Sequence, residues 1–308
     1  MPYHYKTYGL EFVSDIQLPE LTDISDPQEC QTPDVVVRCA PVPLPEEVRA
    51  TGAWYDFSEE GACFWWSTVG AFNVSANGCT IDVERAVGVS DDLIAFPLLG
   101  PVLSEVLRRQ ALFVLHASAV DIDGMGVALM ADKGTGKSSS SAALLRSGAH
   151  LIADDLVAID TREAKIIPGF AQVKLDEKML DGLDAQKWIV RPRAHDLIDK
   201  FRVMVPDLLA PVPVPAARLY VIERGDSHHN RIEDIPQAMA LPSILRFSYA
   251  ARFGTALLSD KAAAEHFRNA VALSNKAVVK RLILANSLDH LDTLIDTIRD
   301  DILDGTTG

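Results

Sequence analysis

The residues with the clearest chemical meaning lie in the segment 131–138, which reads ADKGTGKS. It matches the phosphate-loop pattern G-x-x-x-x-G-K-[ST], with Ala131 in place of the first glycine. Glycine at 134 and 136 lets backbone N–H groups turn inward around a phosphate, where a Cβ would block the approach. Lys137 adds a mobile charge for the β- and γ-phosphates, and the Ser138 hydroxyl is an oxygen ligand suited to Mg²⁺. The predicted nucleotide-binding residues are Asp132, Lys133, Gly134, Thr135, Gly136, Lys137, Ser138 and Ser139.

The sequence around this loop predicts the two elements that such a site requires. An apolar strand, GVALM, precedes the loop, and a helix is expected from about Lys137 to Arg146, ended by Gly148. A helix in that place points its unsatisfied N–H groups and the positive end of its dipole at the bound anion. The alternative is a serine-rich helix start that binds nothing. The order of strand, loop and helix favours the phosphate site.

Two consecutive acids are the next candidates. Asp154 and Asp155 follow the apolar run LIA, so they are expected where a strand ends beside the loop. Because neighbouring side chains of a strand point to opposite faces, either the strand ends there or only one acid reaches the site. If both reach it, one can hold a metal while the other accepts the proton of an attacking hydroxyl. The alternative is a solvated turn after a strand.

His116 lies in the segment FVLHASAV, predicted as a strand, on the same face as Ser118. A single histidine in a strand is more often structural than catalytic, and neither its spacing nor its surroundings change that balance.

Composition limits the function further. Apolar residues make up 48% and charged residues 23% of 308, as in ordinary globular proteins. Lys plus Arg is 29 and Asp plus Glu is 43, and the net charge of −14 argues against binding to nucleic acid or to an anionic membrane. The four cysteines show no C-x-x-C spacing, so no zinc site is predicted. With no apolar run of membrane-spanning length and no signal peptide, we expect a cytoplasmic protein.

The pattern of turns and apolar runs predicts two regions. Residues 1–90 read as a mostly β region, with a hairpin formed by AFNVS and CTIDV. A helix is expected after Ser90, broken or delayed by Pro97 and Pro101. Residues 91–308 form the second region, in which the predicted strands are ALFVLHASAVDID, GVALMAD, HLIADDLVAID, PGFAQVKL and ARLYVIER. The C-terminal part is predicted helical in IPQAMALPSILRFSYAARF and from about Lys261 to Leu303, with a break near Asn286.

The block LHASAVDIDGMGVALMADKGTGKSSSSAALLRSGAHLIADDLVAI resembles the HPr kinase family, whose core is related to phosphoenolpyruvate carboxykinase. In that family a strand histidine precedes the phosphate loop, and a turn like the one from Arg146 to Gly148 leads to a strand ending in Asp-Asp. The resemblance implies an α/β fold with a mixed sheet around the loop, preceded here by the smaller β-rich region. It covers about 45 residues in order.

The resemblance also implies roles. Asp154 would be the general base towards a substrate hydroxyl, and Asp155 would bind Mg²⁺ together with Ser138. His116 would assist the base or the transferring phosphoryl group, and Lys137 would stabilise charge on the phosphates. Ser139 stands where HPr kinases usually carry Glu, and the family's later signature is not recognisable in residues 161–235. The basic residues of that later signature would supply positive charge to the site. In this sequence Lys200 and Arg202 are the candidates for that charge.

These features favour an ATP- and Mg²⁺-dependent kinase that phosphorylates a serine of a peptide or small protein. The layout is similar to a divergent branch that includes lasso-peptide kinases, which would make the C-terminal serine of a precursor peptide the acceptor. The alternatives are a kinase of free serine or another small hydroxyl metabolite, a nucleotide-binding regulator without transfer activity and, ranked last, a carboxykinase. Residues 1–90 favour a peptide, which can lie along a strand edge there. HPr kinases form hexamers, and the resemblance leaves a homo-oligomer open.

Overall fold

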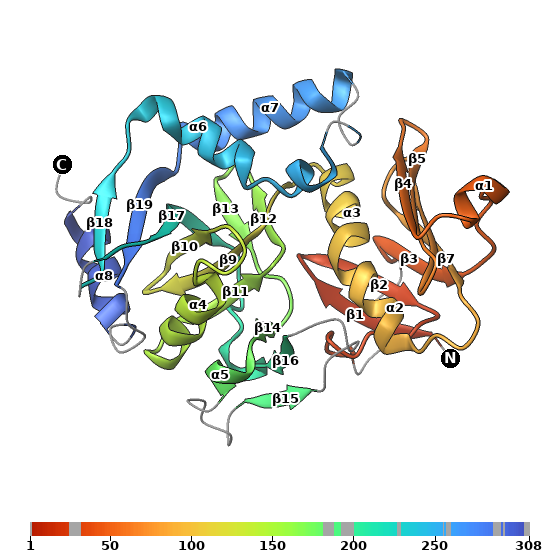
Figure 1. The fold of residues 1–308 in the computed structure, drawn as a ribbon, viewed down its shortest axis with the longest axis horizontal. Coiled ribbons are helices and arrows are strands. Elements are labelled where there is room, and N and C mark those ends of the chain that lie inside the picture. Colours follow the sequence, from red (N-terminus) through yellow and green to blue (C-terminus); the bar gives the residue numbers. More distant parts are fainter. Residues whose placement is uncertain are drawn as a thin grey trace. The chain divides into compact units, whose positions relative to one another are not determined.

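The computed structural model describes residues 2–24, 32–180, 188–191, 200–226, 229–254, 256, 260–285, 291 and 293–304. The chain forms two compact units, Met1–Leu112 with Arg252–Ala264, and Phe113–Ala251 with Glu265–Gly308 (Figure 1). This division differs from the sequence-based boundary at residue 90, because the helical segment that follows residue 90 groups with the N-terminal strands. That the first region recognises a substrate stays a prediction.

The first unit contains a seven-stranded sheet with the order β1-β2-β3-β7-β6-β5-β4. Its strands are β1 (Tyr3–Thr7), β2 (Leu10–Ser14), β3 (Val35–Cys39), β4 (Ala53–Phe57), β5 (Gly61–Trp66), β6 (Gly70–Ser75) and β7 (Thr80–Arg85), and a short helix α1 (Glu46–Arg49) precedes β4. The predicted hairpin is confirmed, since β6 and β7 pair antiparallel with Phe72 opposite Val83. Alternate residues of β7, Ile81 and Val83, are buried, as the period of a strand with one covered face requires.

A broken helical segment follows the sheet and packs on β6. It consists of α2 (Asp91–Pro97), a wide turn η2 (Leu98–Val102) and α3 (Leu103–Arg109). The predicted break occurs at Gly100, whose φ of −118° and ψ of −108° are not helical. Pro101 follows it, so the ring that cannot continue the regular hydrogen-bond pattern explains the kink.

The second unit is α/β with a mixed sheet, as predicted. Its nine strands are β8 (Phe113–Leu115), β9 (Ala117–Ile122), β10 (Met125–Met130), β11 (His150–Asp154), β12 (Val157–Asp160), β13 (Lys165–Ile167), β17 (Val214–Arg224), β18 (Arg231–Asp234) and β19 (Val278–Leu284). The order is β11-β9-β10-β17-β13-β12-β8, and β19 lies between β17 and β18. Strands β10, β17 and β19 are parallel, while β9, β11 and β18 are antiparallel to their neighbours.

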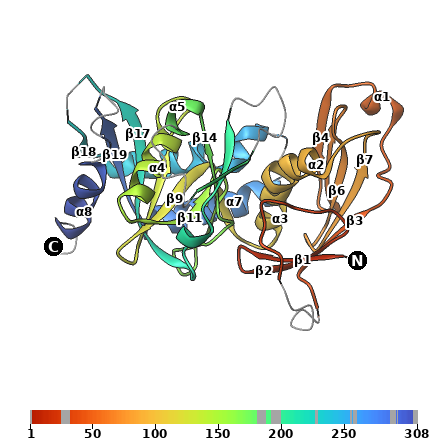
Figure 2. The same ribbon diagram turned by 90° about the horizontal axis from the view of Figure 1, so that it is seen from below.

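Helix α4 (Lys137–Arg146) packs along β9, β10 and β11, as Figure 2 shows for β9 and β11. A separate three-stranded sheet has the order β14-β16-β15, formed by β14 (Gln172–Leu175), β15 (Ile189–Arg191) and β16 (Phe201–Met204). The remaining elements are α5 (Glu177–Leu180), η3 (Pro206–Leu208), α6 (Gln237–Arg246), η4 (Tyr249–Phe253), α7 (Asp260–Ser274) and α8 (Leu294–Asp304). In the part of the chain that the structure describes, none of the helices is long and apolar enough to cross a membrane.

Three secondary-structure predictions are wrong in detail. The expected strand around residues 111–123 is two strands, β8 and β9, interrupted at His116, and HLIADDLVAID divides into β11 and β12 at Asp155. The expected C-terminal helical stretch contains β19, a strand paired on both sides. Its apolar residues fit a helix equally well by spacing, and pairing with β17 decides between the two. The predicted break near Asn286 lies outside the described residues.

Candidate functional site

Strand directions bring the predicted residues to one edge of the large sheet. Strands β10 and β11 flank β9 and run opposite to it, so their C-terminal ends meet the start of β9. Met130 pairs with Ala117, and Asp154 pairs with Ser118. The phosphate loop after β10, the acids at the end of β11 and His116 before β9 therefore share this edge.

The loop has the backbone shape that its glycines predict. Gly134 and Gly136 have φ values of +84° and +120°, a region that side chains with a Cβ rarely adopt. A Cβ on Gly136 would lie 2.9 Å from Leu284 Cδ1 and 3.3 Å from Arg224 Nη2, the ends of side chains that can shift, so the backbone conformation is what favours glycine there. Arg224 Nε donates to the Thr135 carbonyl at 3.1 Å, and α4 begins directly after Gly136. This strand–loop–helix unit directs the helix N-terminus towards the loop.

The other residues of the loop lie around this turn. Asp132, Lys133 and Gly134 are exposed, while the segment from Thr135 to Ser139 is half-buried. Asp132 Oδ2 accepts from Arg246 Nη2 at 2.5 Å, in an ion pair whose two side chains are both largely exposed. Lys200 Nζ donates to Ser138 Oγ at 2.9 Å, so this candidate for the additional positive charge does reach the loop.

Asp154 ends β11 with 7% of its surface exposed. The Ser118 hydroxyl donates to Oδ1, and the backbone N–H of Lys174 donates to Oδ2 at 2.9 Å. Both carboxylate oxygens are thus held by internal donors.

Asp155 lies just beyond the strand and adopts a left-handed backbone with φ of +70°. Aspartate tolerates this conformation better than most residues, because its short side chain can bond locally. Its Oδ2 accepts from Lys174 Nζ at 2.8 Å, and its Oδ1 lies 3.6 Å from His116 Nε2. The strand has therefore ended at the second acid, and the two carboxylates have different partners.

The electrostatics keep Asp155 ionised. Burial alone would raise the pKa of its carboxyl, but the charges of Lys174, Lys137 and His116 outweigh burial and hold that pKa far below its ordinary value. Burial lowers the pKa of Lys137, helped by Lys200 and Lys174, while Asp155 and Asp154 oppose this shift. Three lysine ammonium groups thus gather with two carboxylates beside the loop, an arrangement suited to a polyphosphate.

His116 joins β8 to β9 and is not inside a strand, which corrects the prediction that placed it there. Its backbone N–H donates to the Phe247 carbonyl at 2.8 Å, and its ring centroid lies 6.1 Å from that of Tyr249. The chain must turn from one part of the sheet to another here, and this backbone contact fixes the turn. The imidazole reaches Asp155, so the structure does bring His116 to the acids.

Ser138 and Asp155 each have donor atoms of the kind that a magnesium ion takes. A hydroxyl and an ionised carboxylate are hard oxygen donors, and each already accepts a hydrogen bond from a lysine ammonium group. Mg²⁺ in nucleotide sites usually takes one or two protein ligands, with phosphate oxygens and water completing its shell. Within the described ranges, no group of three or more His, Cys, Asp or Glu side chains is arranged to hold a metal ion.

Sequence reasoning missed Lys174 and Arg224. Both lie in predicted strands, where a basic residue carries no signal for a site, and only the tertiary structure brings them to the loop and the acids. Arg202, the second basic candidate, lies in β16 opposite Lys174 and is 5% exposed.

Comparisons with known proteins match the segment that contains the loop and the two acids. Residues 110–181 match the family model of the HPr Serine kinase C-terminal domain. An HPr kinase/phosphorylase of Limosilactobacillus reuteri (strain DSM 20016) is 36% identical over 86 residues, 24% of this chain and 27% of the relative. One of Brevibacillus brevis is 34% identical over 95 residues, 30% of each protein. The chain therefore matches less than a third of the length of these curated relatives.

A solved Hpr(Ser) kinase/phosphatase from Coxiella burnetii aligns with 63% of this chain and 93% of its own, at 14% identity and a TM-score of 0.31. A likeness that distant says nothing about the site. The family model and the curated relatives support an HPr-kinase-like family, and the matched segment contains His116, the loop, both acids and Lys174.

Proposed function

We propose that this HPr-kinase-like chain is an ATP- and Mg²⁺-dependent kinase that transfers the γ-phosphoryl group to a serine hydroxyl of a peptide or small protein. The observation that carries the proposal is the meeting of a phosphate loop with a pair of acids and three lysines at one sheet edge. Phosphoryl transfer depends chiefly on positioning and on stabilisation of charge, which such a cluster supplies.

Each side chain has a proposed part. The loop N–H groups and Lys137 bind the phosphates, and Ser138 with Asp155 hold Mg²⁺, which when bound neutralises phosphate charge. Asp154 accepts the proton of the serine hydroxyl as the new P–O bond forms and the bond to ADP breaks. To do so it exchanges the internal hydrogen bond from Ser118 for one from the acceptor. His116, beside Asp155, assists the transferring group.

The sharpest form of the proposal makes the acceptor the C-terminal serine of a lasso-peptide precursor, on the similarity of layout described above. A kinase of free serine, or of another small hydroxyl compound, is the second candidate, since the site chemistry is the same. A nucleotide-binding regulator without transfer activity is the third, and the presence of both acids argues against it. We also propose a cytoplasmic location, because the proposed donor is ATP, and a homo-oligomer, by resemblance to the hexameric HPr kinases.

A mass-spectrometric transfer assay separates these candidates. The chain is incubated with Mg-ATP, a precursor peptide ending in serine and free serine together, with Asp154→Asn as the matched control. A gain of about 80 Da on the peptide that is absent with the variant supports the peptide kinase. Phosphoserine alone favours the metabolite kinase. Transfer to neither, with nucleotide still bound, contradicts the proposed activity.

A further inference from the structure

A single residue outside the loop contacts both acids. The backbone N–H of Lys174 donates to Asp154 Oδ2 at 2.9 Å, and its ammonium group donates to Asp155 Oδ2 at 2.8 Å. The two bonds come from different parts of one residue, so they fix the two carboxylates relative to each other. The side chains of Lys174 and Asp155 are 25% and 26% exposed, which leaves this ion pair partly shielded from water.

The small sheet explains how Lys174 is held. Strand β14 pairs antiparallel with β16, with Lys174 opposite Arg202, and β14 also packs against α4, the helix that follows the loop. Val173 and Leu175, on either side of Lys174, are 1% and 0% exposed and anchor the strand in the core. Strand geometry turns Lys174 to the opposite face from these two neighbours, and there it meets the acids.

Asp155 lies just beyond the end of β11, where the contacts of its side chain fix its orientation. Its left-handed backbone is uncommon for a residue with a Cβ, and conformations of this kind persist where surrounding contacts determine them. Lys174 binds one carboxylate oxygen, and His116 lies near the other.

We propose that Lys174 is a positioning residue of the transfer reaction, which holds Asp155 in its orientation beside the phosphate loop and fixes it relative to Asp154. This inference rests on the proposed kinase function. It assigns Lys174 a different part from Lys200, whose ammonium group contacts Ser138 of the loop and not the acids. Loss of Lys174 therefore acts more on turnover than on nucleotide affinity, whereas loss of Lys200 acts more on nucleotide affinity.

Steady-state kinetics with the full chain test this difference, using Lys174→Met, Lys174→Arg and Lys200→Met. Lys165→Met is the matched control, because Lys165 is a partly exposed strand lysine paired with Glu163 at 2.7 Å. We expect Lys174→Met to lower kcat at least about tenfold, and by a larger factor than it raises the KM for ATP, as small misplacements of reacting groups do. Lys174→Arg keeps a higher kcat than Lys174→Met, since it preserves the charge although not the compact shape of the ammonium group. Lys200→Met raises KM more than it lowers kcat.

A kcat for Lys174→Met within about twofold of wild type overturns the inference, and so does a Lys174→Arg variant as slow as Lys174→Met. Crystal structures of wild type and Lys174→Met give a second test without turnover. A displaced Asp155 carboxylate in the variant supports the inference, and an unchanged one contradicts it. If wild type phosphorylates no acceptor, the proposed function fails, and the two crystal structures still decide the role of Lys174.

Discussion

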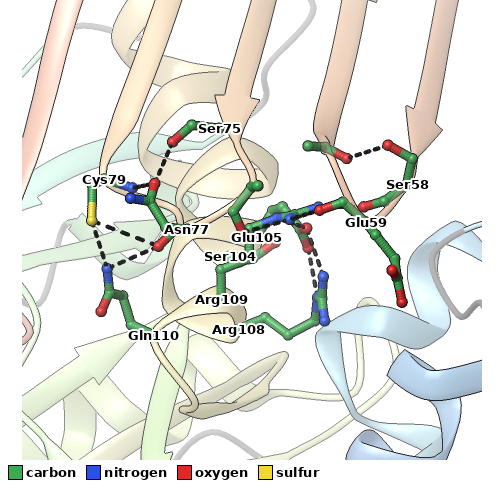
Figure 3. A network of polar contacts seen from close by, with 12 residues as sticks. Ser58, Glu59, Ser75, Asn77, Cys79, Ser104, Glu105, Arg108, Arg109 and Gln110 are labelled. Atoms are coloured by element: carbon green, nitrogen blue, oxygen red, sulfur yellow. Dashed lines mark hydrogen bonds and ion pairs between the residues drawn. The ribbon is translucent and has the colours of Figure 1, made fainter.

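Two charged networks of this protein, one in each unit, show how differently buried acids can be used. In the first unit, Glu105 is 1% exposed and accepts from Arg108 and Arg109 at 2.7 and 2.6 Å (Figure 3). Arg109 also donates to the carbonyls of Ser58 and Ala76 at 2.8 and 2.9 Å. This network ties α3 to the ends of strands β4 and β6, so its charges serve the fold.

The network around Asp155 is built differently. The charges that act on Asp155 come from Lys174 of β14, Lys137 of α4 and His116. Lys200, just before β16, contacts Ser138 of the neighbouring loop. Glu105 is bound by side chains three and four residues away on its own helix, whereas Asp155 is bound across the fold. A buried acid alone therefore does not indicate a functional site. Several cationic side chains beside an anion-binding loop are the feature that indicates one.

Removing the proposed base should give the largest effect. We expect Asp154→Asn to lower turnover by about a thousandfold while leaving nucleotide binding unchanged, because the loop and Asp155 stay in place. Phosphotransfer kinetics and calorimetric nucleotide binding measure the two quantities. Near-normal turnover would refute the assignment of the base.

Breaking the first network should affect stability and not activity. Glu105→Gln leaves two arginines without their shared carboxylate, so the free energy of unfolding should fall by about 3 kcal/mol. Denaturant unfolding measures this, and turnover per folded molecule is expected to be unchanged. A selective loss of turnover would place the Glu105 network in the reaction and remove the contrast.

Lys137→Ala should weaken nucleotide binding and turnover together, by about a hundredfold in kcat/KM, because it removes a preorganised charge from the phosphates. Calorimetry with ATP and the same kinetic assay provide the measurement. Unchanged kinetics would mean that the loop binds no phosphate.

A third network offers a pH test. Burial alone would raise the pKa of Asp301, but hydrogen bonds from Lys280, Tyr220 and Arg218 hold it below its ordinary value. A carboxyl with a lowered pKa stabilises the fold above its unfolded pKa, near 4, and loses this contribution as the pH falls through the folded value. Asp301→Asn should therefore lower the free energy of unfolding by about 2 kcal/mol at pH 7, and by less as the pH falls below about 4. Denaturant unfolding of wild type and variant across that pH range measures this loss. A loss of stability that does not depend on pH would contradict the lowered pKa of Asp301.

The smallest effect is expected at the histidine. His116→Ala should lower turnover by about tenfold, since the imidazole assists a site whose other charges remain. Kinetics and thermal unfolding of the same variant distinguish a role in the transfer reaction from a structural role. A variant that merely unfolds would make His116 structural.

Local patterns predicted the part of the site that is continuous in sequence. The glycines, Lys137 and the Asp-Asp pair each carry a signal, because strand, loop and helix follow one another directly. Lys174 carries no such signal, since its role depends on how β14 packs against α4 and β16. Likewise β19 became a strand through pairing with β17, which spacing alone does not reveal.

A crystal structure with Mg²⁺ and a non-hydrolysable ATP analogue would decide whether the loop binds the nucleotide. We expect the phosphates within hydrogen-bonding distance of the backbone N–H groups of residues 134–138, with Lys137 on the terminal phosphate and Mg²⁺ between Ser138 and Asp155. Nucleotide bound elsewhere, or a loop without phosphate at saturating analogue, would contradict it.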